Sequence, residues 1–162
     1  MPFQQTVNLR LADGVVGELG LEGPLRAQPG VLKGTAANIV IGRAFTIDPA
    51  DGQFSPGGTN PYGGILANPK AYSTSGTAAG GALAPTLTVL AGTDGEFVTS
   101  TPGIWVQLTN AAPVGSGVYF VQADGTLAAG TAGAGQTQIP NATVVRYANA
   151  APGLALVSLN GA

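Results

Sequence analysis

The heptapeptide GIWVQLT, residues 103–109, alternates between two kinds of side chain along its length. Its even positions carry the aliphatic residues Ile104, Val106 and Leu108. A period of two is typical of a β-strand with one buried face, so we predict a strand here. Trp105 and Gln107 fall on the opposite face, and we expect Trp105 to be half-buried at a sheet edge or to lie in an interface.

Similar short segments recur on both sides of this heptapeptide, from residue 86 onward. They are separated by turn residues and include TLTVLAG, GEFVTS, GVYFVQ, ATVVRYA and LALVSLN. Asp124 and Gly125 stand between two apolar segments, which predicts a hairpin. No segment has sustained helical periodicity. The pattern predicts an all-β fold, a small antiparallel β-barrel or sandwich of the jelly-roll kind, over residues 86–162.

The preceding segment, residues 48–85, is dense in Gly, Pro, Asn, Ser and Thr. These residues favour turns, so we predict a long Gly/Pro-rich loop or arm over the whole segment. Structureless runs of this length are uncommon inside a compact domain. Two interpretations stay open, a flexible loop and an arm laid over a neighbouring subunit.

Residues 1–47 form a third region, an extended N-terminal segment in which charged side chains are concentrated. Two short strands are predicted in it, TVNLRL at residues 6–11 and NIVIGRAFTI at residues 38–47. Between them, GVVGELGLEGPLRAQP at residues 14–29 has a glycine at every third position up to Gly23. The repeat is too short for a collagen helix and lacks the spacing of a phosphate loop. We predict that the period is accidental and that the stretch is an extended contact surface for another protein.

The composition excludes most catalytic chemistry. The 162 residues contain no cysteine and no histidine, which removes thiolate nucleophiles and the side chain most often used as a general base near neutral pH. No nucleophile elbow, catalytic triad or phosphate-binding loop can be assigned. We therefore expect no enzyme activity, no catalytic residue, no cofactor and no bound metal.

Charge and hydropathy limit the partners that we expect. Only 9% of the residues are charged while 44% are hydrophobic, so the surface is poorly protected against association and we expect an assembly. Six basic residues against eight acidic ones form no basic stripe for nucleic acid. No apolar run is long enough to span a membrane, and no secretory signal is recognised. We expect a protein used without export, with no membrane, nucleic-acid or small-molecule partner.

Two pairs of acidic residues lie close together in the sequence, Asp48 with Asp51 and Asp94 with Glu96. A carboxylate pair could serve a glycosidase or bind calcium. However, Asp-Pro and Asp-Gly are ordinary turn dipeptides. We therefore predict that both pairs lie in turns.

Four short motifs follow one another along the chain. They are GVVGE at residues 14–18, GPLRA at 23–27, IGRAFT at 41–46 and LALVSLN at 154–160, with a glycine-rich stretch between the third and the fourth. In this order, and with this composition, the sequence resembles the structural cement or head-decoration proteins of tailed bacteriophages.

The resemblance implies a virion structural protein on the outer surface of the phage head, where it would bind the major capsid protein and stabilise the shell. It implies a homo-oligomer, either a dimer or a trimer, made in the cytoplasm of the bacterial host. The capsid contacts expected from the matching positions are Glu18, Pro24, Arg26 and Arg43. We expect Arg26→Ala and Arg43→Ala to weaken attachment more than Lys70→Ala does.

An alternative function is a β-sandwich binding module of a phage tail or head ornament that recognises host glycans. Trp105, Tyr119 and Tyr147 could stack on sugar rings, although core or edge positions explain them equally well. A glycosidase that uses Asp and Glu alone is the least favoured of the three hypotheses.

Overall fold

The computed structural model describes residues 14–35, 38–68, 89–148 and 151–160. The described part contains no helix, and therefore none that could cross a membrane. Its strands are β1 (Arg26–Val31), β2 (Ala44–Ile47), β3 (Phe54–Pro56), β4 (Tyr62–Leu66), β5 (Asp94–Gln107), β6 (Gly117–Val121), β7 (Leu127–Ala129), β8 (Gln136–Tyr147) and β9 (Leu154–Asn160). The strand predicted at residues 6–11 and the side chain of Lys70 lie outside the described residues.

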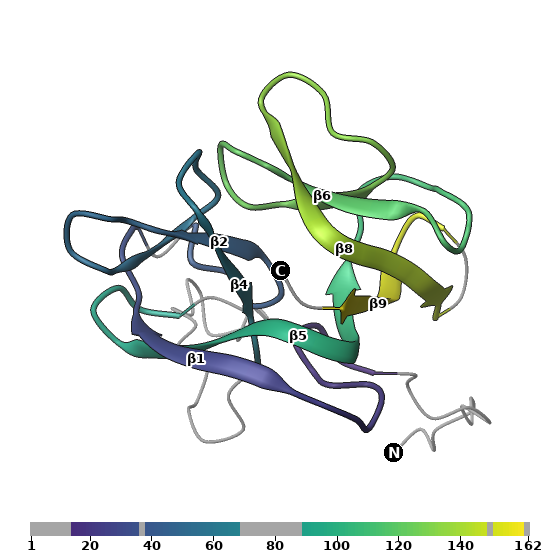
Figure 1. Ribbon diagram of the computed structural model, residues 1–162, viewed down its shortest axis with the longest axis horizontal. Helices are drawn as coiled ribbons and strands as arrows, with labels where there is room; N and C mark the ends of the chain where they lie inside the picture. Colours follow the sequence, from purple (N-terminus) through teal and green to yellow (C-terminus); the bar gives the residue numbers. More distant parts are fainter. Residues whose placement is uncertain (1–13, 36–37, 69–88, 149–150, 161–162) are drawn as a thin grey trace, which may run out of the picture.

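The strands form one antiparallel sheet in the order β3-β2-β4-β5-β9-β8-β6-β7, with β1 paired to β5. Two further bridges bend this sheet back on itself. Leu32, which follows β1, meets Phe54 of β3, and Leu108, which follows β5, meets Leu127 of β7. Figure 1 shows the resulting curled half-barrel. The predicted all-β antiparallel fold is confirmed.

The central strands β2, β4 and β5 separate two hydrophobic cores. Each of these strands has two adjacent buried residues, one for each core, because successive side chains of a strand point to opposite faces. The residues facing the larger core are Ala44, Ile65 and Val98, and those facing the smaller core are Phe45, Leu66 and Phe97. The larger core is completed by β6, β7, β8 and β9.

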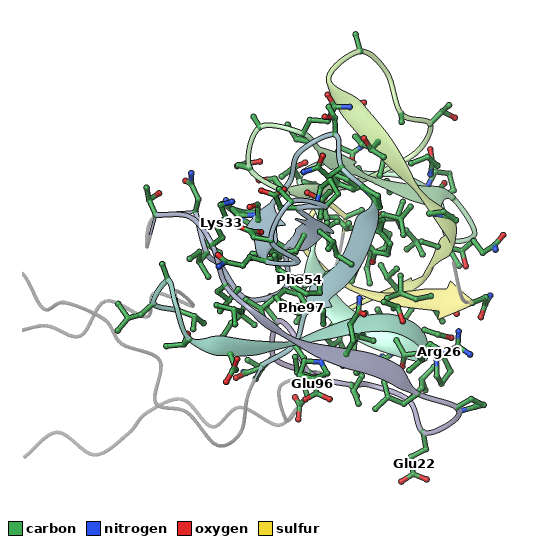
Figure 2. The ribbon with its side chains drawn as sticks, turned by 60° about the vertical axis from the view of Figure 1, so that its left-hand side comes forward. Glu22, Arg26, Lys33, Phe54, Glu96 and Phe97 are labelled. Carbon is green, nitrogen blue, oxygen red and sulfur yellow. The ribbon has the colours of Figure 1, made fainter. Side chains whose placement is uncertain are left out.

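The smaller core is built around aromatic rings. The rings of Phe54 and Phe97 lie together (Figure 2) and are stacked with their centroids 3.8 Å apart. The ring centroid of Phe45 lies 5.2 Å from that of Phe97. Gly30 of β1 lies directly on the ring of Phe54, so that any side chain at this position would overlap it. The glycine therefore permits β1 to approach this core closely.

The prediction of a loop throughout residues 48–85 is wrong for β3 and β4. Glycine in this segment serves close packing as well as turns: a Cβ at Gly64 would lie 3.0 Å from the carbonyl oxygen of Val98. Small residues, which by composition favour loops, thus let β4 pair with β2 and β5. Residues 69–88 lie outside the described residues, so the arm and the boundaries at 47/48 and 85/86 stay predictions.

The strand predicted over residues 38–47 is wrong in its first part, because β2 begins at Ala44. Residues 38–43 form a turn, in which the Arg43 amide donates to the Val40 carbonyl over 3.3 Å. Gly42 has a φ of +78°, which lies outside the extended region, so a strand cannot run through it into β2. The predicted hairpin at Asp124 and Gly125 is confirmed, since these residues connect β6 to β7.

Candidate interaction surface

Residues 14–25, here called the front strip, lie along the second half of β5. Three backbone hydrogen bonds join strip and strand: Gly17 N–H to Trp105 C=O at 2.7 Å, Trp105 N–H to Glu18 C=O at 2.8 Å, and Gly20 N–H to Gly103 C=O at 2.9 Å. The chain then continues as β1 along the first half of β5, again antiparallel. The front strip and β1 together cover one edge of β5 along most of its length (Figure 1).

The glycines of the front strip are the positions at which it touches the sheet. Gly14 and Gly20 lie on the indole of Trp105, and a Cβ at Gly20 would be 2.6 Å from its Nε1 atom. Gly17 and Gly23 face other neighbours at comparably short range, and Gly17 has a φ of +81°. The prediction that the glycine period is accidental is therefore wrong. Every third residue of the strip turns toward the rest of the molecule, where only a hydrogen atom fits.

Trp105 is fully covered by this arrangement and is 2% exposed. Its ring also lies 4.8 Å from the guanidinium carbon of Arg146 on β8, within cation–π range. The expectation that Trp105 is half-buried at an edge or part of an interface is wrong, because the strip of the same chain provides its cover. On the face opposite Ile104 and Val106, Trp105 is therefore buried, whereas Gln107 is exposed.

The aromatic residues considered for glycan binding do not form an exposed platform. Trp105 is buried, and Tyr119 is half-buried on β6. The Tyr147 hydroxyl is engaged with the backbone of Ala112: it donates to the carbonyl over 2.9 Å and accepts from the amide over 3.3 Å. These positions remove the observation that motivated the glycan hypothesis.

The outer side of the front strip exposes apolar side chains. Val15, Leu19, Leu21 and Leu25 are 41–48% exposed, and a shallow hollow of about 400 Å³ lies among the three leucines. With Val31 of β1, they make five of the seven large exposed hydrophobic residues in the described part of the chain. Contiguous exposed apolar side chains mark interaction sites on soluble proteins.

Two charged residues lie beside these leucines, Glu22 on the strip and Arg26 at the start of β1. Both are exposed, and no described residue forms an ion pair or a side-chain hydrogen bond with either. Figure 2 shows both at the same end of the molecule. We call this set the front patch; its members are Leu19, Leu21, Glu22, Leu25 and Arg26.

Three of the four predicted capsid contacts lie at or beside the front patch. Pro24 is exposed between Glu22 and Arg26, and the Glu18 carboxylate accepts a hydrogen bond from the Val15 amide over 3.3 Å. The structure thus places Glu18 and Pro24 on the front strip and Arg26 directly after it, at the start of β1.

Arg43, the fourth predicted contact, lies at a separate groove of about 350 Å³ lined in part by Val16, Ile41 and Leu127. Its guanidinium donates to the carboxylate of Asp124 over 3.2 Å and to the carbonyl of the same residue over 3.3 Å. Burial opposes ionisation of Asp124, but hydrogen bonds from Thr126 and the charge of Arg43 lower its pKa. Arg43 therefore ties the start of β2 to the β6–β7 hairpin.

The acidic pair Asp48 and Asp51 is organised around Lys33. Its ammonium lies 2.7 Å from Oδ2 of Asp48 and 2.8 Å from Oδ2 of Asp51. The hydrogen bond from Lys33 is the main cause that lowers the pKa of each carboxyl group, followed by a backbone hydrogen bond from Ala50 or Gln53. The turn predicted here is confirmed, since each aspartate accepts from an amide two residues on.

The second acidic pair does not lie in a turn. Asp94 and Glu96 belong to β5, where they pair with Val31 and Pro29 of β1. The prediction is wrong because the Asp94–Gly95 dipeptide starts a strand, and Gly95 packs beneath Leu66. In the described residues, no three Asp or Glu side chains cluster in a way that could hold a metal ion.

Sequence reasoning found the location of the front strip but missed its chemistry. The contacts expected from the resemblance include Glu18 and Arg26 but not Leu19, Leu21 or Leu25, which carry the exposed apolar area. The available signal was the glycine period itself. Residues between glycines that face a sheet point outward, so leucine at those positions predicts an apolar outer side.

Comparisons with known proteins give one family and one fold. The model of the family described as "Structural cement protein (E217 gp24/Pam3 gp6)" matches residues 3–160. Among solved structures, the chain is similar to a chain in "The capsid of Myoviridae Phage XM1", with a TM-score of 0.69 and 16% sequence identity over 99% of this chain and 98% of that one. No curated protein matches the sequence.

Proposed function

Since the chain belongs to the structural cement protein family of phages, and is thus a virion protein that reinforces the capsid shell, we propose how it does so. It binds the outer surface of the phage head, contacts the major capsid protein, and works as a homo-oligomer without catalysing a reaction. Its synthesis takes place in the cytoplasm of the bacterial host.

The observation that supports this proposal is the exposed apolar side of the front strip. Most large exposed hydrophobic residues of the described chain lie on the strip and the adjoining β1. Burying the exposed half of one leucine side chain contributes about 1 kcal/mol. Contacts of this size are weak singly, but a partner that binds only the assembled shell stabilises it by mass action.

The charged contacts proposed from the sequence divide into two groups. Glu18, Pro24 and Arg26 lie on or next to the front strip, so their proposed role follows from burial of that strip on the capsid. Arg43 is held by Asp124, and its replacement would also loosen the β6–β7 hairpin. We therefore expect Arg26→Ala to weaken attachment without lowering the melting temperature, and Arg43→Ala to lower both.

A matched pair of leucine variants tests the proposal. Leu25 on the front strip and Leu90 before β5 are 47% and 53% exposed, so an aspartate at either position changes the fold equally little. Occupancy on purified capsids is measured by quantitative mass spectrometry. Leu25→Asp is expected to lower the apparent affinity at least about 10-fold, and Leu90→Asp to leave it within about twofold. Equal affinities of the two variants would refute attachment through the front strip.

A further inference from the structure

The groove beside Arg43, here called the Arg43 groove, is built from four segments that are distant in the sequence. They are Val16 of the front strip, residues 40–43 before β2, Gln107 and Thr109 at and beyond the end of β5, and residues 126–127 at the start of β7. Backbone hydrogen bonds hold these segments in place: the Gly42 amide donates to the Leu66 carbonyl over 2.8 Å, and the Thr109 amide to the Leu127 carbonyl over 3.1 Å. The groove is therefore formed before any partner binds.

The lining of the Arg43 groove suits a peptide segment. Val16 and Val40 are half-buried apolar walls, whereas Gln107 and Thr109 are exposed. The hydroxyl of Thr109 already donates to the Leu127 carbonyl over 3.3 Å, so its oxygen is left to accept a hydrogen bond. The exposed Gln107 amide offers both a donor and an acceptor. An extended segment can thus insert an apolar side chain between the valines while its peptide groups bond to the polar side chains.

The charge of the lining narrows the chemistry of this segment. Among the described residues that line the groove, Arg43 alone is charged, and it is paired with Asp124. A basic side chain entering the groove would meet the guanidinium of Arg43, and like charges in a contact are unfavourable. The segment that fits is therefore neutral or acidic.

The Arg43 groove and the front patch are two separate hollows on one support. The hollow of the front patch includes Thr101, and the groove includes Gln107, so both lie along β5. Six residues of a strand span roughly 20 Å, which is too far for one inserted side chain to fill both. The front strip connects them, since Val16 lines the groove while Leu19 and Leu21 line the other hollow.

We propose that the Arg43 groove is a second capsid contact, which takes a neutral or acidic extended segment of one capsid subunit while the front patch binds a neighbouring subunit. The inference rests on the proposed function in one respect, namely that the front patch is the first contact. A chain held by one subunit adds no link between subunits, whereas a chain held at both sites must lose two contacts before the subunits separate. Each chain then reinforces the shell by itself.

A matched pair of threonine variants tests the groove. Thr109→Arg places a long cation at its rim, and Thr131→Arg makes the same change at an exposed threonine between β7 and β8, outside both sites. Gln107→Arg is a second rim variant, which keeps the Thr109 hydrogen bond. Melting temperatures of the free chains verify that each variant folds. On purified capsids, we expect the dissociation constant to rise at least about 10-fold for both rim variants and to stay within about twofold for Thr131→Arg.

The decisive arm separates attachment from reinforcement. DNA-filled capsids that lack this protein are loaded with each chain to the same occupancy, verified by quantitative mass spectrometry, and heated. The wild-type chain and Thr131→Arg are expected to raise the temperature of DNA release. Both rim variants are expected to occupy the capsid through the front patch and yet leave DNA release close to that of bare capsids. Full DNA retention with both rim variants, or wild-type affinity of both, would overturn the second contact.

Leu25→Asp, measured in parallel, separates this inference from the proposed function. If Leu25→Asp loses attachment while both rim variants bind and reinforce as the wild-type chain does, the Arg43 groove is overturned and attachment through the front strip stands. If both rim variants lose attachment while Leu25→Asp keeps it, the groove is supported and attachment through the front strip is refuted.

Discussion

At the scale of single residues, glycine decides how closely the front strip approaches the sheet. Gly20 packs against Trp105 and Leu156, and its amide donates a hydrogen bond to the carbonyl of Gly103. The strip cannot move outward at this point without breaking that hydrogen bond. A methyl group at position 20 must therefore displace rigid neighbours.

Gly20→Ala tests this packing directly. A Cβ there would lie 2.5 Å from Leu156 Cδ1 and 2.6 Å from Trp105 Nε1, so we expect the free energy of unfolding to fall by about 1–3 kcal/mol. Gly133→Ala is the control, because its new methyl would meet its nearest neighbour, Gln136 Oε1, at an ordinary 3.5 Å. Denaturant unfolding measures both. Equal stabilities would mean that the strip is not packed on Trp105 as described.

Two tyrosines provide a second prediction at the residue scale, because removing the hydroxyl group should affect the free energy of unfolding differently at each. The Tyr62 hydroxyl is buried without a partner among the described residues, and burial raises its pKa. The Tyr147 hydroxyl makes two hydrogen bonds to Ala112. We expect Tyr62→Phe to leave the free energy of unfolding unchanged or to raise it, and Tyr147→Phe to lower it by about 1 kcal/mol. A larger loss for Tyr62→Phe, measured by denaturant unfolding, would contradict the structure.

At the scale of elements, the sequence predicted where strands and hairpins occur better than where each strand begins and ends. The alternation in GIWVQLT correctly identified part of β5, and the Asp124–Gly125 turn correctly located the β6–β7 hairpin. Glycine accounts for the wrong predictions in β4 and in the front strip, because there it permits close packing and does not form a loop. Whether a glycine serves a turn or a close approach depends on residues distant in sequence, such as Trp105, so local patterns could not decide it.

The ion pairs of Lys33 connect the segment after β1 to the turn before β3. They predict that the stability of the fold depends on pH. The pKa values of Asp48 and Asp51 are lowered from 3.8, so their contribution to stability is present above that pH and is lost as the pH falls through the lowered values. In Lys33→Met, both pKa values should rise toward 3.8, with Lys33→Arg as the control that retains the charge. The measurement is an NMR titration of the side-chain carboxyl carbons. Unchanged values in Lys33→Met would exclude the ion pairs in solution.

At the scale of the whole molecule, one curled sheet encloses two cores and presents an apolar strip at its edge. Family membership makes this molecule a capsid cement protein, and the fold is similar to that of a chain in a phage capsid. The sequence could predict the position of the candidate surface but not its apolar character. Its apolar character depends on which side of the front strip the sheet covers, and this follows from tertiary packing.

The central claim is tested most directly by heating DNA-filled capsids prepared with and without this protein and measuring DNA release. Capsids with bound protein are expected to retain DNA to a higher temperature, because binding to the assembled shell lowers its free energy. Re-adding the wild-type chain to bare capsids should restore retention, whereas Leu25→Asp should not at equal concentration. Identical release curves with and without the wild-type chain would contradict the account.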